Sequence, residues 1–187
     1  MKKQRKQLVI MLVLLGFLII AYFALGAYND AQENKEQEET ETITVTDLKY
    51  EDVIAFSYHY KEENNSFIKS GEEWMYDADQ SFDVDETKIE DMLSAACKVK
   101  AEDYFDAYES LDNYGLDEPQ CVINISFTNG STVKLQIGNY NDMVGYYYMM
   151  KEGDNNLYLI DVALYNAFSV SYTDLEYIVE DTEITEE

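Results

Sequence analysis

The sequence has few of the residues on which most enzyme and metal chemistry depends. Its 187 residues include one His and two Cys. A single His excludes most nucleophile–histidine pairs and histidine-based metal sites, and two Cys are too few for a disulfide framework or a four-Cys zinc site. A phosphate-binding P-loop, a dinucleotide-binding glycine pattern and an HExxH motif are also absent. We therefore expect no enzyme, no catalytic residues, no cofactor and no structurally required metal ion.

Basic residues are also scarce. Lys and Arg total 13 against 38 Asp and Glu, which gives a net charge of -25 at pH 7. A nucleic-acid partner is not expected, because phosphate contacts need a basic surface. Arg5 is the last arginine, so the rest of the chain has no bidentate arginine clamp for phosphate or carboxylate groups. The simplest interpretation of the charge is a well-solvated acidic surface.

Apolar and aromatic residues, in contrast, are plentiful. They make up 47% and 14% of the sequence. These fractions are too high for a disordered acidic chain, so a packed core is expected. The length fits one folded domain with appendages.

The N-terminus carries a candidate membrane anchor. Four basic residues within the first six precede an uncharged apolar run over residues 8–28. At about 1.5 Å per residue the run spans roughly 31 Å, which matches a bilayer core of about 30 Å. The basic flank predicts a single-pass protein with a cytoplasmic N-terminus and the rest of the chain outside the cytoplasm. A cleavable signal peptide, cut near Ala24–Gly26, is the alternative, but the run is longer than the roughly 7–15 apolar residues of such peptides.

The remaining chain divides by composition into three parts. Residues 29–42 form a charged, self-repelling linker that holds the domain away from the membrane. Residues 43–179 form the folded domain, and residues 180–187 form an acidic tail. The organisation is therefore a basic stub and anchor (1–28), a linker, one extracytoplasmic domain and a tail.

Within the domain, alternating apolar positions predict strands, and one stretch predicts an amphipathic helix. The helix follows Asp85 as its N-cap and places Ile89, Met92, Leu93 and Ala96 on one face. A turn over residues 61–65 and a type I′ turn at Asn129-Gly130 separate predicted strands. The expected class is α+β, with a mostly antiparallel sheet and two or three short helices. The predicted strands cover residues 54–60, 66–70, 73–77, 99–105, 121–127, 133–137, 143–151 and 156–160, and a short second helix covers 161–168.

Two further patterns were considered for chemistry. The loop from Asp77 to Glu86 begins with the spacing of a calcium-binding EF-hand, but Phe82 and Lys88 occupy the positions that need Gly and Glu. A connection between a strand and a capped helix explains the same residues. Cys97 and Cys121 fall at apolar positions, where they either pair or remain as separate buried thiols.

Three segments in this order resemble the bacterial family called domain of unknown function 4340. They are Glu73–Tyr76 with the helix after it, Leu111–Pro119 with the hairpin after it, and the aromatic segment 143–161. The most specific parts are the Tyr-Gly-Leu-x-x-Pro element and the strand end Leu135–Gly138. The resemblance implies a membrane-tethered extracytoplasmic protein, of a kind often associated with ABC transporter components of the gliding-motility auxiliary type. It implies no catalytic residues. The motif residues that carry it are Trp74, Tyr114, Gly115, Leu116, Pro119 and Gly138.

The Tyr-Gly-Leu-x-x-Pro element also has a physical interpretation of its own. Gly115 suits a turn with positive φ, Leu116 can fill the core, and Pro119 starts the next strand at a position where no backbone donor is needed. These residues are predicted to form a structural corner.

The function predicted from these features is that of a non-enzymatic accessory protein, an auxiliary subunit of an ABC-type transport system that contacts its membrane subunit. The bilayer, through residues 8–28, is the other expected partner. The predicted docking surface is Tyr146, Tyr147 and Tyr148, because aromatic residues dominate interface cores. The same rings can also simply fill the core. The alternative function is that of a cell-wall or glycan-binding module.

Overall fold

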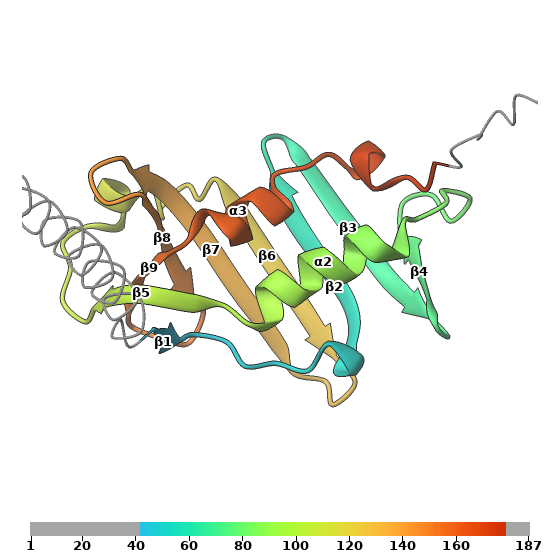
Figure 1. Ribbon diagram of the computed structural model, residues 1–187, viewed down its shortest axis with the longest axis horizontal. Coiled ribbons are helices and arrows are strands. Elements are labelled where there is room, and N and C mark those ends of the chain that lie inside the picture. Colours follow the sequence, from blue (N-terminus) through green and yellow to red (C-terminus); the bar gives the residue numbers. More distant parts are fainter. Residues whose placement is uncertain (1–41, 179–187) are drawn as a thin grey trace, which may run out of the picture. The chain divides into compact units, whose positions relative to one another are not determined.

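The computed structural model describes residues 42–178 (Figure 1). The anchor predicted over residues 1–28, almost all of the linker predicted over 29–42, and the tail predicted over 180–187 lie outside these residues. Between residues 42 and 178, no helix has both the length and the apolar character that a membrane crossing requires. These residues form one large sheet and two α-helices, which confirms the α+β class.

The sheet has nine strands, and each hydrogen-bonded neighbour pair is antiparallel. Their order is β1-β5-β9-β8-β7-β6-β2-β3-β4. Two meanders, β2-β3-β4 and β6-β7-β8-β9, meet where β2 pairs with β6. The strands are β1 (Ile43–Thr44), β2 (Val53–Tyr60), β3 (Glu63–Ser70), β4 (Glu73–Tyr76), β5 (Lys100–Phe105), β6 (Cys121–Phe127), β7 (Thr132–Asn141), β8 (Tyr146–Lys151) and β9 (Leu157–Ile160).

Both helices, α2 (Glu86–Cys97) and α3 (Val162–Phe168), cover the same face of the sheet (Figure 1). The predicted N-cap is confirmed, because the Asp85 side chain accepts hydrogen bonds from the backbone N–H groups of Thr87 and Lys88. The four positions predicted to share the apolar face of α2 are all buried. At the C-terminal end of α2, the buried Thr46 hydroxyl donates a hydrogen bond to the carbonyl of Ala96 and accepts one from the N–H of Val99. A capped amphipathic helix of this kind is therefore fixed at both ends.

The main core lies between this face and the helices. Alternation along β2 directs Phe56 and Tyr58 toward the helices, and Phe56 contacts the rings of Phe67, Trp74 and Phe168. The Phe56 side chain is only 2% exposed. Aromatic edge and stacking contacts add to the free energy of burying these rings. Aromatic rings thus form the centre of the main core.

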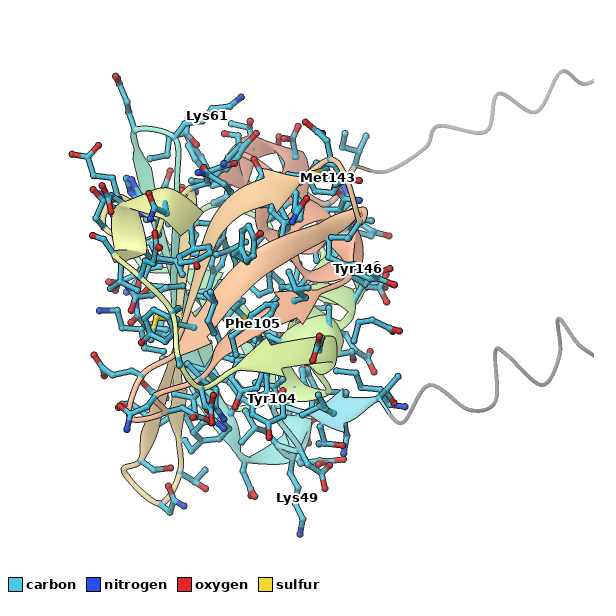
Figure 2. The ribbon with its side chains drawn as sticks, turned by 90° about the vertical axis from the view of Figure 1, so that its left-hand side faces the viewer. Lys49, Lys61, Tyr104, Phe105, Met143 and Tyr146 are labelled. Atoms are coloured by element: carbon cyan, nitrogen blue, oxygen red, sulfur yellow. The ribbon has the colours of Figure 1, made fainter. Side chains whose placement is uncertain are left out.

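The part of the chain between the end of β4 and the start of β6 crosses both faces of the sheet. Helix α2 crosses one face from the β4 edge to β5, and the segment of residues 106–120 returns to β6 across the opposite face (Figures 1 and 2). This segment contains a short 3-10 helix, Leu111–Tyr114. The two crossing segments therefore lie on opposite faces of the sheet.

Two predicted turns differ from the structure. Strand β3 already begins at Glu63, so the turn predicted over 61–65 is shorter; Lys61 takes a positive φ and lets the two strands pair directly. The type I′ turn at Asn129-Gly130 is also wrong, because Asn129 lacks the positive φ that such a turn requires. Instead the four residues 128–131 connect β6 to β7, in a loop where the Gly130 N–H donates to the carbonyl of Phe127 and Gly130 has a φ of 81°.

Both cysteines are buried as free thiols, Cys97 at the end of α2 and Cys121 at the start of β6. Burial raises the pKa of the Cys121 thiol to about 12 and also raises the pKa of Cys97. Because the thiolate is the reactive form, a raised pKa and lack of access both slow modification.

We therefore expect neither thiol to react with an aromatic disulfide reagent at pH 8 in the native protein. After unfolding in guanidinium, both should react at least roughly 100-fold faster than in the native protein, because exposure restores the ordinary pKa near 8.5. Absorbance of the released thiolate measures the result. Fast reaction of the native protein, or no reaction of the unfolded protein without a reductant, would contradict this assignment.

Candidate docking surface

The tip of the β7–β8 hairpin exposes apolar side chains. Met143 is 94% exposed and Val144 is 50% exposed. The strand predicted to begin at Met143 begins instead at Tyr146, because residues 142–145 form the turn. Figure 2 shows Met143 near this tip, well apart from Tyr104 and Phe105 on β5. Exposed apolar residues at a hairpin tip are available for contact with a partner.

Asn141 fixes the conformation of this tip. Its backbone carbonyl accepts a hydrogen bond from the N–H of Gly145 at 2.8 Å, and its Oδ1 accepts from the N–H of Met143 at 3.1 Å. Its Nδ2 donates to the Tyr148 hydroxyl at 2.7 Å. Gly145 takes a φ of 83°, a conformation that glycine adopts without steric cost. The apolar tip is therefore held in one shape before any partner binds, which lowers the entropic cost of binding.

The three predicted docking tyrosines do not form one surface. Tyr147 lies on the helix side, where its ring stacks on Tyr165 of α3 with 4.4 Å between centroids and contacts Tyr140 at 5.0 Å. Burial raises the pKa of the Tyr147 hydroxyl. Tyr146 and Tyr148 alternate with Tyr147 along β8 and so point to the other side of the sheet. The strand thus supports the hairpin from both faces.

Tyr148 meets the corner predicted from the Tyr-Gly-Leu-x-x-Pro element. Its ring contacts that of Tyr114 edge-on, with 4.9 Å between centroids. Leu116 is buried beside this contact at 4% exposure, and Leu159, which pairs with Tyr148 across the strands, is buried as well. The segment 106–120 therefore covers a small apolar cluster on the face opposite the helices.

Two glycines allow this segment to approach β7 closely. Gly115 has a φ of 68°, as the sequence predicts, and a Cβ there would overlap the side chain of Asn139. A Cβ on Gly138 would overlap the backbone carbonyl oxygen of Tyr114 and reach the Leu116 side chain at 3.0 Å. Although the sequence predicts that Pro119 starts β6, it lies two residues before that strand. Of the six motif residues, the structure thus groups four at this corner, all but Pro119 and Trp74.

Trp74, the sixth motif residue, lies away from the corner on the edge strand β4. It is 3% exposed, and its indole N–H donates to the Tyr50 hydroxyl at 3.2 Å. Its backbone N–H donates to Glu86 Oε1 at 2.6 Å. This bond occupies a donor on the free edge of the sheet, which disfavours pairing with another strand.

No described constellation favours catalysis or metal binding. A hollow of about 710 Å³ lies between residues 48–52 and the end of α2, with Cys97 in its lining. Burial disfavours the thiolate that a nucleophilic Cys97 would need. Across residues 42–178, no three His, Cys, Asp or Glu side chains group as a metal site. In the loop considered for calcium, Asp79 Oδ1 accepts from the backbone N–H and hydroxyl of Ser81, as in an ordinary Asx turn.

The exposed tip, with Met143 and Val144, is the feature that sequence reasoning missed. The sequence pattern instead predicts a strand that includes this apolar pair, over residues 143–151. The signal that identifies the turn is Asn141-Asp142 before the pair and Gly145 after it, since these residue types favour turns. Apolar residues between such turn residues indicate an exposed apolar tip.

Comparisons with known proteins give one match. A family model described as "Domain of unknown function (DUF4340)" matches residues 74–176, from Trp74 in β4 to the segment after α3. This range includes the corner and the β7–β8 hairpin. No curated protein and no solved structure matches the chain.

Proposed function

Since the chain belongs to the DUF4340 family, whose description gives no activity, we propose its function from its own sequence and surface. The protein acts as a membrane-anchored extracytoplasmic accessory protein that works by contact and catalyses no reaction. Its partner is the membrane subunit of an ABC-type transport system, as the family resemblance suggests. The observation that carries the proposal is the preorganised apolar tip of the β7–β8 hairpin, with Met143 94% exposed.

The charge around the tip indicates what the partner offers. Asp142 is exposed beside Met143, and the protein as a whole carries a net charge of -25. An anionic lipid surface would repel this domain, whereas a protein pocket with an apolar floor and a basic rim is complementary to it. Met and aromatic residues are also enriched at protein interfaces. A protein pocket is therefore the favoured receptor for the tip.

The test is co-purification of the full-length protein in mild detergent, with Met143→Ser as the variant. The Met143 side chain is almost fully exposed, so the fold should not depend on it. Tyr147 is a less suitable position, because its ring packs on α3. We expect wild type to retain an ABC-type membrane subunit and Met143→Ser to retain about tenfold less, since losing a buried methionine contact costs an interface about 1.4 kcal/mol or more. Quantitative mass spectrometry measures the yield.

The matched control is Ile178→Ser, which removes an exposed apolar side chain elsewhere on the described domain, one that is 73% exposed. This variant should retain the partner at the wild-type level. Recovery of the wild-type protein alone, or equal loss in both variants, would count against the proposal. Retention of the purified protein on a cell-wall glycan, without a membrane partner, would favour the glycan-binding function instead.

A further inference from the structure

The face of the sheet opposite the helices has an uncharged region in an acidic protein. It consists of the first, third and fifth residues of four stretches, one on each of four neighbouring strands. The stretches are Ala55–His59 on β2, Asn64–Ile68 on β3, Val122–Ser126 on β6 and Thr132–Gln136 on β7. None of these residues is Asp or Glu, although the sequence contains 38 of them. We call this region the neutral face. The one charged residue on it, Lys134, pairs with Glu152 at 3.6 Å.

The cross-strand register places these residues side by side. Ser57 on β2 pairs with Ser66 on β3 and with Asn124 on β6, at the centre of the region. Toward one end, Ala55 pairs with Ile68. Because most of these side chains are small, the centre of the face is hollowed by a shallow depression of about 310 Å³. A face of short side chains allows another sheet to approach closely around this depression.

The chemistry of the neutral face is complementary to itself. Asn124 Nδ2 donates to the Ser57 hydroxyl at 3.4 Å, and His59 Nδ1 and Asn64 Oδ1 share a hydrogen bond of 3.1 Å. Hydroxyl, amide and imidazole groups each contain both a donor and an acceptor. A surface of this kind can therefore bind a copy of itself, whereas a surface of carboxylates, which only accept, cannot.

Charge limits where two copies of this protein can touch. Each copy has a net charge of -25, so carboxylate-bearing surfaces repel one another. The neutral face brings no carboxylate of its own into the contact. We propose that two copies associate through this face, sheet on sheet, around a two-fold axis that lies in the plane of the contact. This inference goes beyond the proposed function and does not involve the hairpin tip.

The size of the neutral face sets the expected strength. Four strands about 4.8 Å apart and five residues in length give a face of roughly 19 by 17 Å. Two copies would bury on the order of 650 Å² in total, below the roughly 1,200–2,000 Å² of stable complexes. The association is therefore weak and reversible. It should strengthen with salt, because salt screens the repulsion between the acidic surroundings of the two faces.

Single introduced cysteines test the geometry in the full-length protein in mild detergent. Both native cysteines are buried, so an introduced surface thiol will be the one that reacts. Asn124→Cys lies at the centre of the face, close to the two-fold axis whichever way that axis runs in the plane. With a short bismaleimide, the yield of covalent dimer from this variant should be severalfold higher at 0.5 M NaCl than at 0.05 M NaCl. The matched control is Ser94→Cys on the exposed side of α2, which should remain monomeric at both salt concentrations.

A second pair of variants tests the role of charge. Ser57→Asp, added to Asn124→Cys, places two carboxylates near the axis and should abolish the cross-linking, whereas Ser94→Asp should leave it unchanged. Equal cross-linking of Asn124→Cys and Ser94→Cys, or no cross-linking of Asn124→Cys at either salt concentration, would overturn the proposal. Saturable binding of neutral chitin oligosaccharides by a monomer, lost in Ser57→Asp, would also overturn it and assign the face to carbohydrate.

Discussion

Gly138→Ala is expected to lower the free energy of unfolding by about 3 kcal/mol, because the corner leaves no space for a methyl group. The added Cβ would overlap the carbonyl oxygen of Tyr114, which is backbone and cannot rotate away. Either the segment 106–120 lifts from β7 or the strand shifts. For a domain of this size the melting temperature should fall by roughly 10 °C. Thermal unfolding of the full-length protein in mild detergent, followed by circular dichroism, measures it.

Gly71→Ala is the matched control for this prediction. Gly71 has a φ of 70°, but a Cβ there would have no heavy atom within 4 Å. Its replacement should cost about 1 kcal/mol, from backbone conformation alone. Because Gly138 does not have a positive φ, any excess over the Gly71 variant reports the steric overlap. Equal melting temperatures for the two variants would show that the corner is not closely packed.

Phe56→Ala is expected to have the largest effect of any variant considered, a loss of about 3–5 kcal/mol. The Phe56 ring lies at the centre of the main core and contacts Phe67, Trp74 and Phe168, so that its removal leaves a cavity between β2, its neighbouring strands and α3. Since the total stability of a domain is commonly about 5–15 kcal/mol, the variant should unfold at a much lower denaturant concentration. The measurement is urea unfolding followed by near-ultraviolet circular dichroism.

Ile54→Ala serves as the control in the same strand. Its side chain is 42% exposed, so its loss should cost less than about 1 kcal/mol. If the two variants had similar midpoints, Phe56 would not be a core residue and the assignment of the two faces of β2 would be wrong. If the Phe56 variant fails to express, Phe56→Leu, with an expected cost of about 1–2 kcal/mol, gives the same test at a smaller perturbation.

The sequence predicted those elements whose signals are local. Helix α2 has a capping Asp85 and apolar residues at helical spacing, and the structure confirms both. The alternation of β6 and the left-handed conformation of Gly115 were likewise predictable, because each depends on a few adjacent residues. Local backbone preferences were sufficient for these features.

Other features depend on contacts between distant residues and were not predictable. The Asn129-Gly130 pair suits two kinds of hairpin loop, and the pairing of β6 with β7 selects the one in which only Gly130 has a positive φ. The division of Tyr147 and Tyr148 between two faces follows from alternation, but what each touches, Tyr165 or Tyr114, depends on where α3 and the segment 106–120 pack. The neutral face became evident only when the order of the strands was known.

The path of the chain around the sheet has a consequence for the order of folding. Strand β5 is made before β6, yet its main neighbour in the sheet is β9, and Ala101 pairs with Ile160. The first meander likewise has to wait for β6, since Ala55 pairs with Ser126. A chain emerging N-terminus first therefore cannot complete the sheet until its last strand is available. Pairings so distant in sequence are typical of domains that fold in milliseconds to seconds. Until then, the apolar faces of β2 to β5 stay open to solvent and prone to aggregation.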